Sequence, residues 1–176
     1  MFVEEKNKLE EDIVAISCLY REAFGDDEYT EKDLNIIQKR IEKHSKYQGF
    51  KLVKCVNDVN DVIGFAYGYT SSVGQFYRSL LELHLNEEEK NKWLSDCFEV
   101  VELAVSPTYR RKGIGTEVHD NLLTGLSHET AILTTQIDNY KARSLYMKMG
   151  WRTIKEALDL MVRAPTMTLY GKHLHN

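Results

Sequence analysis

The stretch CFEVVELAVSPTYRRKGIGTEVHDNLL, residues 97–123, decides the fold of this chain. Its first nine residues are almost all apolar, which predicts a central strand buried on both faces of a sheet. Three consecutive cations at 110–112 and a G-x-G pair at 113–115 then lead into a helical pattern. Such a strand–loop–helix turn offers an anion unpaired backbone N–H groups and the positive end of the helix dipole. The loop therefore predicts a pyrophosphate site, with a basic surface turn as the plainer alternative.

Length and composition indicate one ordinary domain. At 176 residues the chain is most simply a single domain spanning residues 1–176. Its 43% hydrophobic and 28% charged residues are typical of a soluble globular protein, and no apolar run is long enough to cross a membrane. Residues 1–12 have no signal-peptide pattern, so we expect a cytoplasmic location and no membrane partner. The net charge of -4 argues against a nucleic-acid partner.

The cysteines and the acidic residues suggest further expectations. Cys18, Cys55 and Cys97 are odd in number and far apart, which predicts reduced thiols in the core and no metal site. Residues 25–33, GDDEYTEKD, are strongly acidic. They form either a solvated helix face with its loop or an acidic mouth that attracts a cationic substrate.

The periodicity of apolar residues predicts an α/β protein with a mixed sheet. Helices are expected at 9–24, from Thr30 through Ile41, within 71–96 with a cap at Asn86, from the glycine loop to near Gly125, and at 139–150. Strands are expected at 50–56, 62–70, 97–105, 130–136, 151–157 and 166–174, the first two forming a hairpin. Strand 62–70 has one face of small residues, including Gly64, and one aromatic face. The insert at 71–96 is either a substrate flap or a packing element.

Two motifs resemble those of a known family. VVELAVSPTYRRKGIGTEVHDNLL resembles motif A of the GNAT superfamily of acyl-CoA-dependent N-acyltransferases, with the [QR]-x-x-G-x-[GA] loop at 110–115. NYKARSLYMKMGW at 139–151 is similar to the family signature N-x-x-A-x-x-L-Y-x-x-x-G-[FW], and one predicted strand separates the two motifs, as in the family. The resemblance implies a GNAT fold over the whole chain, with a mixed, splayed β-sheet of six to seven strands flanked by helices.

The resemblance also implies acetyl-CoA as the co-substrate. The residues expected to bind it are Leu103, Ala104, Val105, Arg110, Arg111, Lys112, Gly113, Ile114, Gly115, Thr116, Asn139 and Ser144. Backbone around Leu103 and Val105 would pair with the pantetheine arm, where the strand parts from strand 130–136. The N–H groups of 111–116 and the Thr116 hydroxyl would hold the pyrophosphate, and a backbone N–H near Leu103 would polarise the thioester carbonyl.

Transfer to an amine needs a base and a proton donor for the leaving thiolate. Glu102 is the expected base, because a carboxylate that interrupts an apolar strand is desolvated, which raises its pKa. A bulge would break the alternation of this strand, so Glu99 remains the alternative base, and a hydrogen-bonded structural carboxylate is the plainer interpretation. Relatives often place a glutamate near this position and a thiolate-protonating tyrosine at the position of Tyr146. A packing tyrosine is the alternative there.

The expected acceptor is a primary amine of a small molecule or peptide. The resemblance assigns its recognition to residues 25–48 and to the insert at 71–96. The acidic residues of these segments mildly favour a small cationic amine over a peptide N-terminus or a lysine; they are Asp26, Asp27, Glu28 and Glu82. An acyl-CoA-binding sensor or regulatory domain without turnover is the alternative function, and a homodimer is left open.

Overall fold

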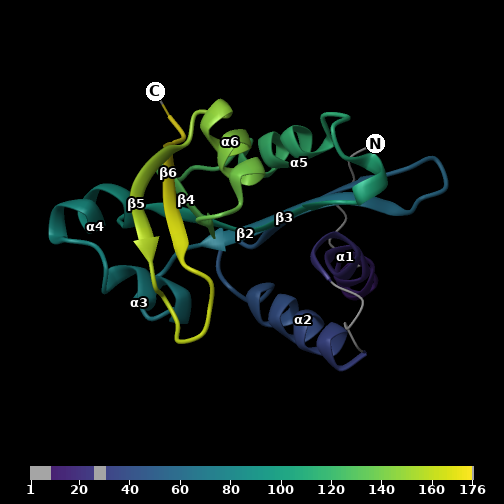
Figure 1. Ribbon diagram of the computed structural model, residues 1–176, viewed down its shortest axis with the longest axis horizontal. Helices are drawn as coiled ribbons and strands as arrows, with labels where there is room; N and C mark the ends of the chain where they lie inside the picture. Colours follow the sequence, from purple (N-terminus) through teal and green to yellow (C-terminus); the bar gives the residue numbers. More distant parts are fainter. Residues whose placement is uncertain (1–8, 26–30, 176) are drawn as a thin grey trace. The chain divides into compact units, whose positions relative to one another are not determined.

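The computed structural model describes residues 9–25 and 31–175, and its described strands form one mixed sheet (Figure 1). The strands are β1 Lys51–Val56, β2 Val62–Thr70, β3 Cys97–Val105, β4 Thr130–Gln136, β5 Arg152–Leu158 and β6 Met167–His173. Their order is β1-β2-β3-β4-β6-β5. The β3–β4 pair is parallel, whereas β1–β2, β4–β6 and β5–β6 are antiparallel. The predicted fold class, an α/β protein with a mixed sheet flanked by helices, is confirmed.

The helices follow the predicted periodicity closely. They are α1 Leu9–Phe24, α2 Glu31–His44, α3 Phe76–Glu82, α4 Glu87–Leu94, α5 Ile114–Leu123 and α6 Tyr140–Lys148. The predicted cap of α4 is confirmed, because the Asn86 side chain accepts from Glu89 N at 2.8 Å and the Glu89 carboxylate accepts from Asn86 N at 2.9 Å. Thr30, the predicted start of the second helix, lies outside the described residues. Among the described helices, none has both the length and the apolar character that crossing a membrane requires.

The chain divides into two compact units. Unit 1 comprises residues 1–69 and 101–124, and unit 2 comprises residues 70–100 and 125–176. Strand β3 therefore contributes its first residues to unit 2 and its last five to unit 1. The described part of each unit has its own hydrophobic core. That the whole chain behaves as one domain stays a prediction.

The core of unit 1 lies between strand β2 and the helices α1 and α2. Its buried side chains are Ile13, Ile16, Leu19, Ile37, Ile41, Phe65, Tyr67 and Ala104. On the opposite face of β2, a Cβ added to Gly64 would lie 2.6 Å from Ile114 Cγ2. The predicted division of β2 into a bulky and a small face is therefore confirmed, and the small face lets α5 approach closely. Figure 1 shows α5 on one side of β2 and β3, and α1 with α2 on the other.

The core of unit 2 contains the insert between β2 and β3. Leu81 of α3 and Trp93 and Leu94 of α4 are buried with Ile132 of β4 and Leu169 of β6. A Cβ added to Gly171 would lie 2.5 Å from the Trp93 ring, so the insert packs tightly on β6. This close packing supports the interpretation of the insert as a packing element.

The cysteines correct one expectation. All three are free, and Cys55 and Cys97 are buried as predicted. Cys18 is exposed, so placing it in the core was wrong. The reason is the periodicity of α1: Ile13, Ile16 and Leu19 form its buried stripe, and the position before Leu19 turns away from that stripe. Burial raises the pKa of Cys97 to about 12, so this thiol stays protonated.

Candidate active site

The glycine loop joins β3 to α5 and has the backbone geometry of an anion site. Gly113 is the N-cap of α5 with φ 86°, and Arg111 has φ 63°, so both lie in the left-handed region. A Cβ added to Gly113 would meet nothing within 4 Å, which means that the space before it is open. The Glu117 N–H donates to Gly113 O at 3.0 Å. The N–H groups of 114–116 therefore precede the first bond of the helix and suit a pyrophosphate.

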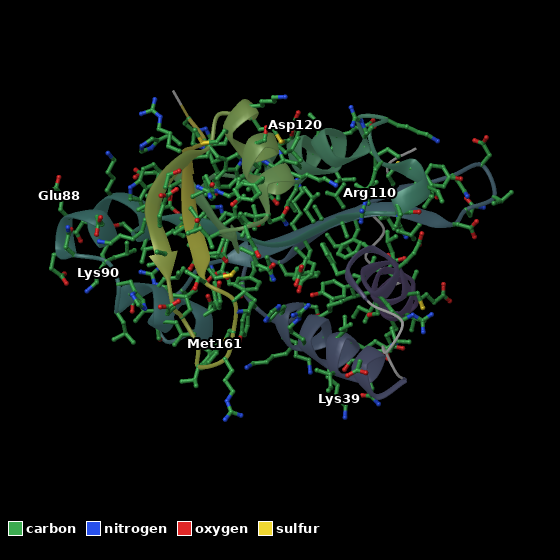
Figure 2. All side chains as sticks on the ribbon, viewed as in Figure 1. Lys39, Glu88, Lys90, Arg110, Asp120 and Met161 are labelled. Atoms are coloured by element: carbon green, nitrogen blue, oxygen red, sulfur yellow. The ribbon has the colours of Figure 1, made fainter. Side chains whose placement is uncertain are left out.

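The three predicted cations of the loop do not share one role. Arg110 donates from Nε to Val105 O at 3.2 Å and from Nη2 to Ala23 O at 2.9 Å, which ties the loop to the end of α1 (Figure 2). Lys112 Nζ lies 4.7 Å from the centre of the Tyr109 ring. All three side chains are exposed. Arg111 and Lys112 are therefore open to an anion, whereas two hydrogen bonds to carbonyl oxygens hold the exposed Arg110 guanidinium within unit 1.

The other predicted residues of unit 1 frame the end of β3. Ala104 and Ile114 are buried, and Ser106 N–H donates to Ile63 O at 2.9 Å, which fixes the end of β3 on β2. The residues that keep some exposure are Leu103, Val105, Gly115 and Thr116. The buried Ala104 and Ile114 anchor the loop. The four partly exposed residues can contact a ligand through backbone or hydroxyl groups.

Glu102 on β3 is paired with Arg40 on α2. Arg40 Nη2 donates to Glu102 Oε1 at 2.7 Å, and the two side chains are 39% and 16% exposed. Burial raises the pKa of Glu102 to about 7, although the positive charge of Arg40 opposes this shift. Burial alone would lower the pKa of Arg40, but Glu102 and the nearby Tyr67 and Tyr20 raise it above its ordinary value. Arg40 is therefore charged, and Glu102 titrates near neutral pH.

Aromatic side chains surround this ion pair. The Arg40 guanidinium lies 5.2 Å from the centre of the Tyr20 ring, and His44 Nδ1 lies 3.2 Å from the Tyr67 hydroxyl. Burial, together with Arg40 and Lys43, lowers the pKa of His44 to about 4, so His44 is neutral at neutral pH. We call Tyr20, Arg40, His44, Tyr67 and Glu102 the Arg40–Glu102 cluster.

Sequence reasoning missed Arg40 and His44, although a signal was present. Arg40 lies three residues after Ile37, and His44 three residues after Ile41, so both fall on the buried stripe of α2. Polar residues on such a stripe need a partner inside the protein. The sequence alone did not identify that partner.

The structure places the two candidate base residues in different surroundings. Glu99 is 4% exposed, and Ser71 Oγ donates to its Oε2 at 3.4 Å within unit 2. Glu102 belongs to unit 1, keeps more exposure and pairs with a charged side chain. The alternation of side chains between the two faces of β3 does not predict this difference between the surroundings of Glu99 and Glu102.

The second motif forms α6 and its start in unit 2. Asn139 is the N-cap of α6, and its Oδ1 accepts from Ala142 N at 3.2 Å. Ser144 is exposed on the same helix. The half-buried Tyr146 has its ring 6.1 Å from that of Trp151 and 6.3 Å from that of Tyr170. The predicted residues of α6 thus belong to unit 2, and the glycine loop and Glu102 belong to unit 1.

Comparison with known proteins identifies the family. The model of the acetyltransferase (GNAT) family matches residues 13–151, a span that holds both the glycine loop and the α6 motif. The chain therefore belongs to the GNAT acetyltransferase family. Members of this family use acetyl-CoA as co-substrate, and the open glycine loop with its exposed cations fits the pyrophosphate of that molecule.

Individual relatives are distant. The chain is 27% identical over 101 residues to the GCN5-like protein acetyltransferase Rv2170 of Mycobacterium tuberculosis, covering 53% of this chain and 49% of that protein. The match thus spans about half the length of that relative. The ribosomal-protein-S18-alanine N-acetyltransferase from Escherichia coli has a TM-score of 0.68 at 13% identity, covering 100% of this chain and 94% of that chain. A chain of the NatC complex bound to Gag peptide and CoA has a TM-score of 0.67 at 15% identity, covering 99% and 98%. These structural likenesses show the fold.

Proposed function

We propose that the protein transfers the acetyl group of acetyl-CoA to a primary amine of a small molecule or peptide, with Glu102 as base and Tyr146 as acid. The observation that carries the proposal is the carboxylate of Glu102, which is 16% exposed on β3 and whose pKa burial raises to about 7. A base with a pKa near the working pH is both available in its ionised form and strong enough to accept a proton.

The residues proposed to hold acetyl-CoA come from both motifs. The N–H groups of 111–116, with the exposed Arg111 and Lys112, would bind the pyrophosphate. Backbone groups of 103–105 would pair with the pantetheine arm, and Asn139 and Ser144 would contact it from α6. Acetyl-CoA supplies the thioester, and the residues of the chain supply orientation and proton transfer.

The proposed step is a direct displacement. The amine nitrogen attacks the thioester carbonyl carbon, so a C–N bond forms and the C–S bond breaks. Glu102 takes one proton from the ammonium form of the acceptor before attack and releases it to solvent. Tyr146 gives its phenolic proton to the leaving thiolate, and it regains the second proton that the nitrogen loses as the amide forms. The net products are the acetylated amine, free coenzyme A and one proton.

The surroundings of the two glutamates favour Glu102 over Glu99 in this role. Glu99 is almost fully buried beside Ser71, which leaves little room for an acceptor. Glu102 keeps some exposure, and its neighbour Arg40 is itself 39% exposed. Tyr146 is half-buried against Trp151 and Tyr170, an arrangement that orients its ring while leaving part of it accessible.

The test is release of coenzyme A in the presence of a panel of amines that includes polyamines, aminoglycosides, amino acids and peptides. Because the exposed Cys18 would react with thiol reagents, coenzyme A should be measured by chromatography or in a Cys18→Ser variant. We expect equal amounts of coenzyme A and acetylated amine with at least one acceptor. Binding of acetyl-CoA without release of coenzyme A for any amine would instead identify a sensor or regulatory domain.

A further inference from the structure

Resting on the proposed function, we propose that the acceptor is zwitterionic: a small primary amine with a carboxylate close to the nitrogen, as in an amino acid. The Arg40 guanidinium would bind that carboxylate while Glu102 receives the amine. The two groups lie side by side in unit 1, joined by the 2.7 Å contact between Nη2 and Oε1.

The contact between Arg40 and Glu102 leaves donors of the guanidinium for a second anion. It is a single hydrogen bond from Nη2, whereas a guanidinium can present two parallel N–H groups to one carboxylate. The guanidinium also has a side-chain hydrogen bond with Tyr20, whereas its buried Nε has no hydrogen-bond partner among the described residues. Since 39% of the Arg40 side chain is exposed, an acceptor can reach the guanidinium from solvent.

The positive charge of Arg40 discriminates between kinds of amine. An acceptor without an anionic group would bring its ammonium to Glu102 and, at the same time, close to the Arg40 guanidinium, which repels it. An acceptor with its own carboxylate replaces one internal ion pair by two pairs with the ligand, so each charge keeps a partner. The neutral His44 and the Tyr67 hydroxyl add polar groups to the cluster without adding charge.

Binding of a carboxylate to Arg40 would also strengthen the base. The Arg40 charge opposes the rise in the pKa of Glu102, so an anion that neutralises Arg40 makes Glu102 a better proton acceptor. Of the acidic residues on which the expectation of a cationic acceptor rests, 26–28 lie outside the described residues, and Glu82 accepts a hydrogen bond from Arg78 Nε at 2.8 Å in unit 2. The described part of the cluster therefore points to an acceptor with both charges.

The test compares amino acids with their carboxamides, which keep the amine and side chain but lack the carboxylate. For the best acceptor we expect kcat/KM to favour the acid by roughly 10-fold or more, the usual effect of a charge-assisted hydrogen bond. Arg40→Met should bring the ratio of kcat/KM for the acid to kcat/KM for the carboxamide close to one, mainly by raising KM for the acid. Arg40→Lys should keep part of the preference for the acid. The difference between acid and carboxamide in the acceptor's own pKa is the same for every variant, so it cancels when this ratio is compared between variants. The strengthening of Glu102 by a bound carboxylate requires Arg40, so its loss in Arg40→Met is part of the expected effect.

Lys39 provides a matched control. It precedes Arg40 on α2, is exposed, and points away from α1 in Figure 2, so Lys39→Met removes the same charge outside the cluster. Lys39→Met should keep the wild-type ratio. Two results would overturn the zwitterionic acceptor without contradicting the proposed transferase activity. One is acetylation of polyamines or peptides with no preference for acids over carboxamides. The other is a preference for acids that is unchanged in both Arg40→Met and Arg40→Gln. Absence of coenzyme A release with every amine would instead overturn the proposed function itself.

Discussion

Arg40 on α2 and Glu102 on β3 are joined by a 2.7 Å hydrogen bond, and Glu102 nevertheless has a pKa raised to about 7. An exposed carboxylate beside a guanidinium would instead have a lowered pKa. Burial therefore outweighs the opposite charge at this position. Glu102 is a base whose strength depends on what Arg40 contacts, and the predictions on acceptor choice and pH dependence follow from that coupling.

Acetyl-CoA should stabilise the protein through the glycine loop. At 100 times its dissociation constant, a ligand adds about 2.7 kcal/mol to the free energy of unfolding, which for this size is a rise in Tm of roughly 5–10 °C. Gly113→Val should abolish the rise, because a β-branched residue does not tolerate φ 86° and its side chain would fill the open space before the loop. Thermal unfolding with and without acetyl-CoA measures both effects.

Gly125→Val is the matched control for Gly113→Val. Gly125 follows the other end of α5, has φ 75° and, like Gly113, has nothing within 4 Å of an added Cβ. Gly125→Val should lose about as much stability as Gly113→Val but keep the rise in Tm with acetyl-CoA. A folded Gly113→Val variant that keeps the full rise in Tm would place the pyrophosphate elsewhere.

Gly64→Ala should destabilise the protein by about 1–3 kcal/mol, the usual cost of overpacking. The reason is the 2.6 Å separation between the added Cβ and Ile114 Cγ2. Ile114→Ala removes that atom, so the double variant should be less destabilised than the sum of the two single changes. Chemical denaturation of the four proteins measures the coupling, and strict additivity would mean that β2 and α5 do not meet at this point.

His44 should make stability depend on pH. Its pKa falls from the ordinary 6.5 to about 4 in the folded state, mainly through burial. The contribution of neutral His44 is therefore complete above about 6.5 and is lost as the pH falls towards 4. Glu102 acts in the opposite direction, because its pKa is raised from 4.5 to about 7 and its ionisation costs stability as the pH rises through that range.

The two effects are separated by single variants measured by denaturation across the acidic range. His44→Gln should remove the loss of stability on acidification, so the difference in the free energy of unfolding between this variant and wild type shrinks as the pH falls. Glu102→Gln should remove the loss of stability that wild type shows as the pH rises from 4.5 to about 7. Parallel curves for wild type and His44→Gln would show that His44 titrates normally and is not held neutral by the cluster.

Tyr146→Phe should lower turnover by about 10²-fold while leaving the affinity for acetyl-CoA nearly unchanged, the pattern expected when a general acid is lost. Tyr140, which is 74% exposed on the same helix, offers the control variant Tyr140→Phe with normal turnover. Steady-state kinetics and a binding titration provide the two readouts. Normal turnover of Tyr146→Phe would make this residue a packing tyrosine, with solvent protonating the thiolate.

Much of the fold was predictable because its signals are local. The apolar run of β3, the capping residues of α4 and the alternation of β2 each depend on neighbours a few residues away. The Arg40–Glu102 pair joins residues 62 positions apart, and only the packing of α2 against the sheet brings them together. Sequence patterns mark Arg40 as a polar residue on a buried stripe, but they cannot identify its partner.

The glycine loop shows the same limit within a motif. The sequence predicts Arg110, Arg111 and Lys112 as cations of one anion site, with Arg110 at the [QR] position of the family motif, but it does not predict what each side chain contacts. In the structure, the Arg110 guanidinium donates to the carbonyl oxygen of Ala23, 87 positions earlier, and to that of Val105. Tertiary contacts therefore decide which cations of a predicted anion site remain open to a ligand.

The most direct test of the central claim is the pH dependence of kcat/KM for wild type and Glu102→Gln with the same amine acceptor. If Glu102 is the base, the wild-type profile falls on the acidic side of about pH 7, the pKa to which burial raises this carboxyl. Glu102→Gln should lose that limb and be slow near neutral pH, and it should recover part of its rate at high pH, where the amine is already neutral. A Glu102→Gln profile with the wild-type midpoint and rate would contradict the role of Glu102 and assign proton removal to another group.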